Sequence, residues 1–267
     1  MNREIFLRWD YGGAIIMDAL YNIDEAFHTN YTPVLDEMLN QQLSDVTSIG
    51  YKLLHGLPLP TDKAVGDIVG LFPITYLNRL LQRTETNMTP QRINTTAWWT
   101  VVNRTVDFIL TWPHTLKDGT FSRDEHGSWS NQTDQNASFV WADDQFMGLA
   151  LLSRYSVIAD VTRQEQLLQF VCKQLQLFNE HLSLNETGLT THGYNDASGH
   201  QSCCSWGRGQ GWGLMALVEG LSALDRADPK VGVTFEKERN FLLNVFQRRI
   251  ASIMKYQNQN TGFWKQV

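Results

Sequence analysis

Apolar residues recur along most of the chain at intervals of three and four positions, the spacing of an amphipathic helix. The clearest stretch runs from Pro33 to His55, where we expect a single helix with one apolar stripe: Val34, Leu35, Met38, Leu39, Leu43, Val46, Ile49 and Leu53. The same period predicts further helices at about residues 9–27, 65–83, 91–112, 143–160, 163–182, 209–225 and 235–256. Strict alternation, the mark of half-buried strands, does not recur. The pattern predicts an all-α protein.

A weak internal repeat lies within this helical pattern. Three segments, at residues 118–123, 187–193 and 261–267, each follow a predicted helix and begin with Gly near an apolar residue. The first two lead into Trp-containing motifs that open a new helix, WADDQFMGLALL at 141–152 and WGRGQGWGLMAL at 206–217. A repeat of two helices and a loop predicts helical hairpins around a shared site, which is an (α/α) toroid. Chance similarity between short Gly-rich turns is the alternative.

No Ser-rich linker or block of charge divides the sequence, so we expect one domain over residues 1–267. About eight helices are predicted, whereas a closed (α/α)6 barrel of six hairpins needs twelve. The third copy of the loop motif also has no helix after it. We therefore expect a toroid that is truncated after its fourth hairpin.

Composition excludes several classes of protein. The chain has 267 residues with 22 Lys and Arg against 28 Asp and Glu, a net charge of −6, which argues against a nucleic-acid binder. No apolar run is long enough to span a membrane. Three cysteines cannot form a disulfide framework. We expect a protein with no nucleic-acid or membrane partner, and its oligomeric state is not predicted.

The N-x-S/T triplet, the acceptor of N-linked glycans, occurs more often than composition explains. Random order would give about two triplets, and the sequence has seven, at Asn30, Asn87, Asn94, Asn103, Asn131, Asn136 and Asn185. This excess predicts a secreted glycoprotein. The first ten residues, MNREIFLRWD, carry charges where the apolar core of a signal peptide would lie, so no export signal is visible in them.

Asp143 and Asp144 follow Trp141 at the start of a predicted helix. A carboxylate in the first turn of a helix can simply cap it, because the free N–H groups and the helix dipole favour negative charge there. Aromatic neighbours, however, desolvate a carboxyl group and adapt it to general acid catalysis. The nine tryptophans of the chain also fit a sugar site, although a large core would use them equally well.

The segments T-H-G-Y-N-D at 191–196 and W-G-R-G-Q-G-W at 206–212 are unusual in a helical protein. Glycine lowers the stability of a helix, so the glycines at a predicted helix start indicate tight turns or close approach of the backbone to a ligand. Arg208, between two Trp residues, can hold a carboxylate in a bidentate fork. The spacing matches neither a dinucleotide fingerprint nor a phosphate loop, and no G-x-S-x-G nucleophile motif occurs.

A metal site is weakly supported. Four potential ligands lie close in sequence, namely His192, His200, Cys203 and Cys204. Their spacing fits no known zinc pattern, and adjacent cysteines do not easily share one tetrahedral ion. Ordinary loop and core residues are the better interpretation, so we expect no metal site here. Asp67 is a lone carboxylate near a helix start, and capping is its ordinary role.

These motifs resemble those of the unsaturated rhamnogalacturonyl hydrolases, glycoside hydrolase family 105, which are related to the family 88 unsaturated glucuronyl hydrolases. The family pattern begins with W-x-Y, here ending at Tyr11, and continues with a helical Asp, here Asp67. W-x-D-x-x-[FY]-M follows at 141–147, and then His192 precedes W-G-R-G-x-G-W at 206–212. Order and spacing agree over nearly the whole chain.

The resemblance implies an (α/α)6 barrel that removes a 4,5-unsaturated uronic acid from the non-reducing end of lyase-generated oligosaccharides, without a cofactor. One carboxyl group protonates the vinyl ether at C4 and then helps water to add at C5. Asp143 matches this acid/base, and Asp67 would assist it. The predicted substrate-binding residues are Tyr11, Asp144, His192, Trp206, Arg208 and Trp212.

Three differences from the family are visible. Relatives often carry a His where this chain has Arg123, and a small residue where it has Asp144. They also continue about 100 residues further, as a twelve-helix plan requires. Two other hypotheses therefore stay open. One is an inverting glycosidase that uses Asp67 and Asp143 as its two carboxylates. The other is an inactive, truncated relative that binds sugar.

Overall fold

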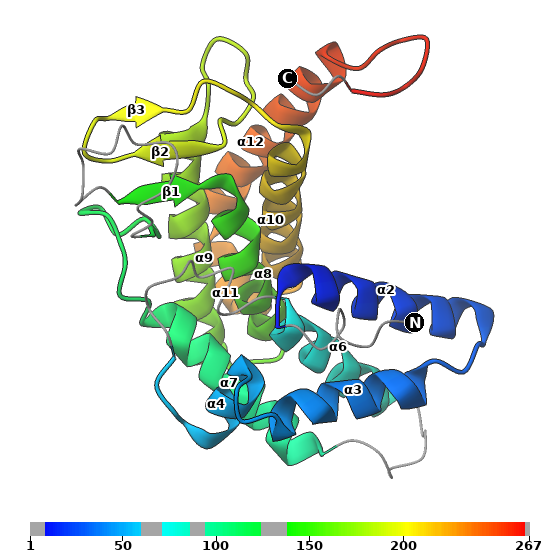
Figure 1. Cartoon of the computed structure of the whole chain (residues 1–267). Coiled ribbons are helices and arrows are strands. Elements are labelled where there is room, and N and C mark those ends of the chain that lie inside the picture. The colour runs from blue at the N-terminus through cyan, green and yellow to red at the C-terminus, as the bar shows by residue number, and fades with distance from the viewer. Residues whose placement is uncertain (1–8, 60–70, 86–93, 124–137, 265–267) are drawn as a thin grey trace. The chain divides into compact units, whose positions relative to one another are not determined.

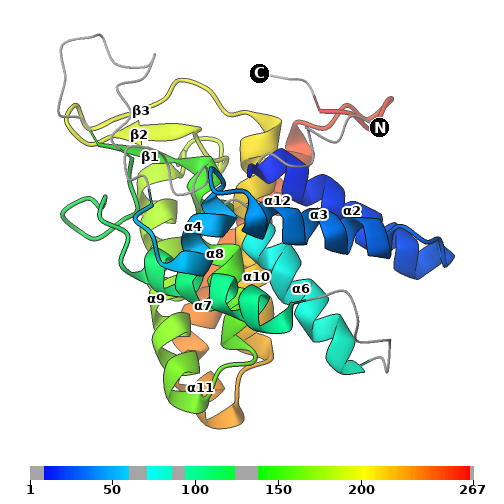
Figure 2. The same ribbon diagram turned by 60° about the horizontal axis from the view of Figure 1, so that its bottom comes forward.

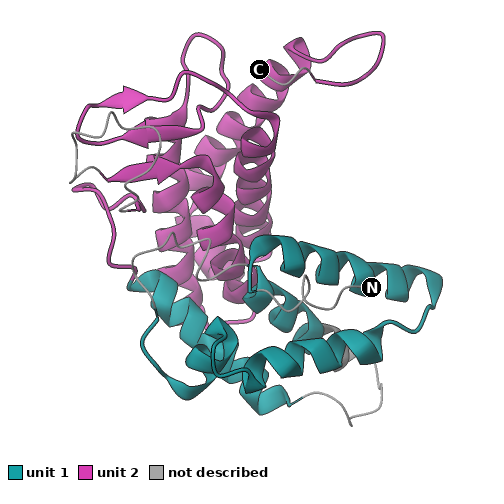
Figure 3. Cartoon of the chain, viewed as in Figure 1, with its two compact units in different colours: residues 1–111 teal, residues 112–267 magenta. Residues whose placement is uncertain are grey.

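A computed structural model describes residues 9–59, 71–85, 94–123 and 138–264. The chain forms two compact units, Met1–Thr111 and Trp112–Val267 (Figure 3). In the first unit the helices are α2 (Tyr11–Phe27), α3 (Thr32–Ser44), α4 (Ile49–His55), α6 (Phe72–Glu85) and α7 (Thr95–Leu110). In the second they are α8 (Ala142–Ser156), α9 (Val161–Leu182), α10 (Gly207–Asp225), α11 (Pro229–Thr234) and α12 (Glu236–Lys255). Among the described residues, no helix is both long and apolar enough to cross a membrane.

The first unit is built by helices that pack in pairs. α2 contacts α3 and α6, and α7 contacts both α4 and α6 (Figure 2). Their shared core includes Trp98, which meets the edge of Tyr76 at a centroid distance of 5.0 Å. The buried Tyr76 hydroxyl donates to the Leu39 carbonyl at 2.8 Å, so the one polar atom of this ring is satisfied.

The prediction of a single helix over residues 33–55 is wrong. Two helices, α3 and α4, cover this stretch, and the helical conformation is interrupted between them at Asp45–Ser48. The Asp45 carboxylate accepts bonds from Thr47, and Ser48 caps α4 by accepting from the Tyr51 amide at 3.1 Å. These local side-chain bonds compete with the helix, whereas Val46, which the stripe would bury, is 65% exposed.

The second unit is a layer of long helices with a small sheet at one end (Figure 1). α8 lies between α9 and α10, and α12 packs against both α9 and α10. α8 buries twelve of its fifteen residues, including the large side chains Leu149 and Leu151. Because α8 is covered on most sides, its first turn is held rigidly.

The sheet was not predicted from the sequence. It has three antiparallel strands in the order β1 (Phe139–Trp141), β2 (Gly193–Asn195) and β3 (His200–Gln201). Strands of two or three residues are too short to show an alternating pattern, and glycine in β2 lowers its strand propensity further. β1 nevertheless leads directly into α8, and β3 ends shortly before α10 begins, so the sheet lies beside the start of both helices.

The three loop motifs of the predicted repeat share one conformation. Their glycines, Gly119, Gly188 and Gly262, have φ angles of +92°, +70° and +71°, the left-handed region that glycine enters most easily. A β-bridge closes each loop at a similar offset, Thr115 with Phe121, Ser183 with Thr190, and Gln257 with Trp264. The structure thus confirms the repeat, because chance similarity would not reproduce both the φ angle and the bridge.

A substitution pair tests how much Gly188 contributes. A Cβ at Gly188 would overlap the hydroxyl of the buried Ser252, whereas a Cβ at Gly199, also at positive φ, meets no atom within 4 Å. We expect Gly199→Ala to lower the free energy of unfolding by about 1–2 kcal/mol through φ strain alone. Gly188→Ala should cost more, because overpacking adds about 1–3 kcal/mol. Urea denaturation measures both values, and equal losses would contradict the packing argument.

Candidate active site

The sheet brings together segments that are far apart in sequence. β1 pairs with β2 so that Trp141 faces Gly193, and the amide of Ala142 donates to the carbonyl of His192 at 2.8 Å. On the other side of β1, Arg123 and Phe139 exchange two backbone hydrogen bonds at 2.9 and 3.0 Å. Three sequence motifs therefore lie side by side at the N-terminal end of α8.

Asp143 and His192 are in direct contact at this junction. The Nε2 atom of His192 lies 3.3 Å from Oδ2 of Asp143, and each side chain is 21% exposed. Within the described part of the chain, Oδ2 of Asp143 is buried without a hydrogen bond. A carboxyl oxygen of this kind is not committed to a structural hydrogen bond, which suits a group that exchanges protons.

Neither aspartate caps the helix. Trp141 occupies the N-cap position of α8 without a side-chain cap bond, and Asp143 and Asp144 both lie inside the first helical turn. The alternative that one of these aspartates simply caps the helix is therefore wrong. Both are nevertheless acidic residues of the first turn, where the positive end of the helix dipole lies.

Two indole rings contact the ring of His192 at an angle, and the three rings form the row that we call the aromatic stack. Its ring lies 4.9 Å from Trp141 and 4.5 Å from Trp206, where the contact is edge-on. Beyond Trp206, the guanidinium of the exposed Arg208 lies 4.1 Å from the indole centroid. Aromatic walls around a carboxyl–imidazole contact exclude water, and an exposed arginine beside them can meet an anionic ligand.

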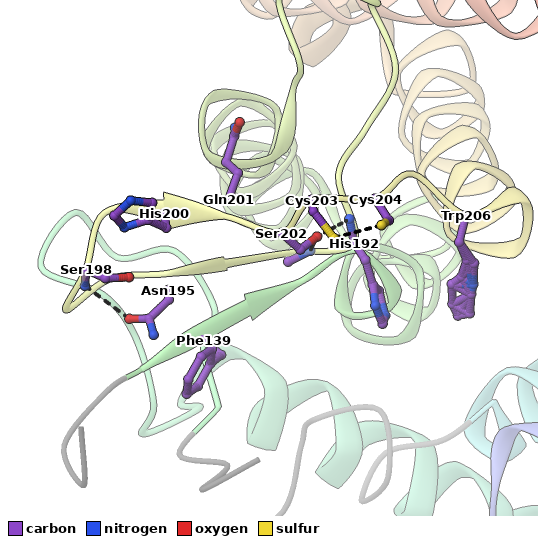
Figure 4. Close-up of a pocket in the computed structure, with 11 residues that line it drawn as sticks. Phe139, His192, Asn195, Ser198, His200, Gln201, Ser202, Cys203, Cys204 and Trp206 are labelled. Atoms are coloured by element: carbon purple, nitrogen blue, oxygen red, sulfur yellow. Dashed lines mark hydrogen bonds between the residues drawn. The ribbon is translucent and has the colours of Figure 1, made fainter. Parts of the chain in front are cut away.

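A pocket of about 590 Å³ opens beside this stack (Figure 4). His192 and Trp206 line it, together with Asn195, His200 and Cys203. Figure 4 shows the His192 and Trp206 side chains leaving the loop on the same side, opposite to Gln201. Asp143 does not line this pocket and reaches it through its contact with His192. The volume fits a small sugar unit.

Asp144 does not face the pocket. It is 1% exposed, and its two oxygens accept from Nη2 and Nε of Arg123 at 2.7 and 3.0 Å. The Arg123 guanidinium also lies 4.0 Å from the Trp141 centroid. The prediction that Asp144 binds substrate is corrected here, because a carboxylate buried in an ion pair presents no surface to a sugar.

The other predicted site residues lie elsewhere in the structure or outside its described residues. Trp212 is 7% exposed and stacks on Phe146 at 5.4 Å, so its ring belongs mainly to the packing between α8 and α10. Tyr11 is 40% exposed at the start of α2, in the first unit. Asp67 lies outside the described residues. The structure thus brings together Asp143, His192, Trp206 and Arg208 of the predicted set.

The adjacent cysteines line the same pocket. The sulfurs of Cys203 and Cys204 lie 2.8 Å apart and both residues are exposed. Their mutual hydrogen bond raises the pKa of the Cys204 thiol, whereas burial raises the pKa of Cys172 to about 12. Among the described residues, no three His, Cys, Asp or Glu side chains are arranged to hold a metal ion.

Residues 7–267 match the family model described as Glycosyl Hydrolase Family 88. The chain therefore belongs to glycosyl hydrolase family 88. Membership of this family, together with the helical structure, confirms the toroid class predicted from the sequence. It also assigns the chain to the glycosidases, whose substrates are carbohydrates.

Solved structures of family 105 share the fold of this family 88 chain. A family 105 glycoside hydrolase from C. acetobutylicum ATCC 824 superposes with a TM-score of 0.62 at 16% identity, covering 100% of this chain and 69% of that one. Possible family 105 members from Salmonella enterica serovar Paratyphi A and Klebsiella pneumoniae give TM-scores of 0.62 and 0.59, both at 16% identity. These alignments cover 95% and 94% of this chain, but only 57% and 56% of theirs.

Two features of the site were not assigned from the sequence. Arg123 was noted only as a difference from the family, and its ion pair with Asp144 spans 21 residues. Ser202 was not noted at all, although its hydroxyl accepts from the amides of His192 and Gly193 at 3.1 and 3.2 Å. No local pattern identifies such partners, because each depends on how distant loops meet.

Proposed function

We propose that this family 88 protein removes a 4,5-unsaturated uronic acid from the non-reducing end of lyase-generated oligosaccharides of the rhamnogalacturonan type. The contact between Asp143 and His192 beside an aromatic-walled pocket carries this proposal. A single acid/base carboxyl group suffices for hydration of a vinyl ether, whereas direct glycosidic cleavage needs two carboxylates. Asp143 is such a group within the second unit.

The chemistry requires one proton to be given and one to be taken back. The Asp143 carboxyl protonates C4 of the double bond, and the ring oxygen stabilises the cation that forms at C5. Water adds at C5 and returns a proton to the Asp143 carboxylate, which restores the acid. The hemiketal then opens to a ketone at C5, which leaves a hemiacetal at C1. Collapse of this hemiacetal to an aldehyde breaks the C1–O bond and releases the sugar alcohol.

The neighbours of Asp143 fit this sequence of steps. His192 lies 3.3 Å from the carboxylate and can hold either the acid or the attacking water in place. Trp206 offers an apolar wall to the sugar. Arg208 is the exposed cation of the stack, and its fork suits the C6 carboxylate of a uronic acid.

Loss of the double bond gives a direct test. Unsaturated uronides absorb in the ultraviolet, so we expect this absorbance to decay when the protein is incubated with pectin-lyase products over a broad range of pH. A matched saturated oligosaccharide should not be cleaved. Cleavage of the saturated sugar with inversion would instead support the two-carboxylate mechanism, and no decay of the unsaturated one would contradict hydration.

The role of Asp143 can be separated from that of the helix end it occupies. We expect Asp143→Asn to lower kcat about 10²- to 10⁴-fold, because the residue serves both proton steps. Glu236→Gln is the control, since it also removes an acidic residue from the first turn of a helix, α12, in the same unit. Melting temperatures should change little in either variant. Retention of activity by Asp143→Asn would exclude it as the acid/base.

We also propose that the protein is secreted and glycosylated. Four of the seven N-x-S/T asparagines lie in described residues, and all four are exposed: Asn30, Asn94, Asn103 and Asn185. We expect the protein from a eukaryotic secretory host to lose mass when treated with an N-glycan amidase, and Asn185→Gln to remove one glycan. A mass equal to that of the bare chain would overturn this proposal.

A further inference from the structure

A buried ion pair adjoins the candidate acid. Arg123 and Asp144 form two parallel hydrogen bonds at 2.7 and 3.0 Å, and their side chains are only 6% and 1% exposed. Asp144 directly follows Asp143 in the first turn of α8. Two charges this deeply buried are costly to desolvate, and a bidentate pair of this kind fixes orientation more reliably than it adds stability.

The pair is also the buried end of the aromatic stack. The guanidinium of Arg123 lies 4.0 Å from the centroid of Trp141, whose ring lies 4.9 Å from that of His192. The row continues through Trp206 to Arg208, at 4.5 and 4.1 Å. Each end of the row is an arginine, but only Arg208 is exposed, whereas Arg123 is held by a carboxylate.

Backbone bonds fix Arg123 at its other side. Its amide and carbonyl pair with Phe139 of β1, two residues before Trp141. Arg123 therefore joins β1 to α8: its backbone pairs with Phe139, and its guanidinium contacts both Asp144 in the first turn of α8 and the ring of Trp141. Any rotation of Trp141 toward Arg123 is blocked, so Trp141 forms a fixed wall against which His192 rests.

We propose that Arg123 and Asp144 are a positioning pair that holds Trp141, and through it His192, in register with Asp143. This inference rests on the proposed function for its kinetic consequence, but the arrangement itself is independent of the substrate. The pair does not touch the sugar. It also neutralises the second carboxylate, so that Asp143 alone of the two neighbouring aspartates is available to exchange protons with a ligand.

The first test exchanges arginine for lysine at two sites. Arg123→Lys keeps the charge but loses the planar fork and the stacking on Trp141. Arg154→Lys is the control, because Arg154 lies near the other end of α8 and forms an equivalent two-point bond with Glu219. We expect Arg123→Lys to lower kcat about 10- to 100-fold at nearly unchanged KM, since small misplacements of this kind are costly. Arg154→Lys should keep its kcat within about twofold.

A second variant separates positioning from stability. Replacing a buried ion pair by apolar residues is often neutral or stabilising, so Arg123→Met combined with Asp144→Leu should fold with a melting temperature near that of the native protein. The positioning role predicts that this double variant still has the low kcat of Arg123→Lys. If its kcat equals that of the native protein, the pair is merely structural and the proposal is overturned.

The position of His192 can be read without any substrate. The proton on Cε1 of His192 feels the ring currents of Trp141 and Trp206, and its nuclear magnetic resonance signal is identified by its loss in His192→Gln. We expect this signal to shift in Arg123→Lys and in the double variant, but not in Arg154→Lys. An unchanged signal in all three would overturn the proposal. If the signal shifts in the variants as expected but the native protein has no activity, only the proposed function is contradicted.

Discussion

The candidate site depends on the antiparallel pairing of β1 with β2. This ladder sets Trp141 opposite Gly193 and joins the start of α8 to the carbonyl of His192. Asp143 and His192 are 49 residues apart in sequence, and this ladder brings the segments that carry them together. A few backbone hydrogen bonds therefore bring the two side chains together, because they fix both distance and register.

Burial divides the charged groups of the second unit into two kinds. Asp144 and Arg123 are removed from water and satisfy each other, whereas Asp143 and Arg208 keep contact with solvent. Groups of the first kind orient their neighbours, because an ion pair in a low-dielectric interior has one favoured geometry. Groups of the second kind remain available to a ligand. Two adjacent aspartates thus acquire opposite roles from their surroundings.

The repeated glycine turns follow helices, and the candidate site lies after two of them, at the first turns of α8 and α10. Gly119, Gly188 and Gly262 each reverse the chain after a helix, through a left-handed conformation that other residues adopt only at a cost. The packed helices supply rigidity, and the candidate chemical groups lie at the N-terminal ends of α8 and α10 and in the loop that carries His192. Family 88 membership and the likeness to family 105 structures agree with this plan.

From the sequence alone, periodicity predicted most of the helices, and short motifs singled out the repeat and the group of Asp143, His192, Trp206 and Arg208, because periodicity and motifs are local properties. The sequence could not determine the break at Asp45–Ser48, where side-chain bonds outweigh an unbroken apolar stripe. Nor could it determine the sheet, whose strands are too short to carry a period. The role of Asp144 was decided by tertiary structure only, since its partner lies in another loop and a buried carboxylate takes its function from whichever cation it meets.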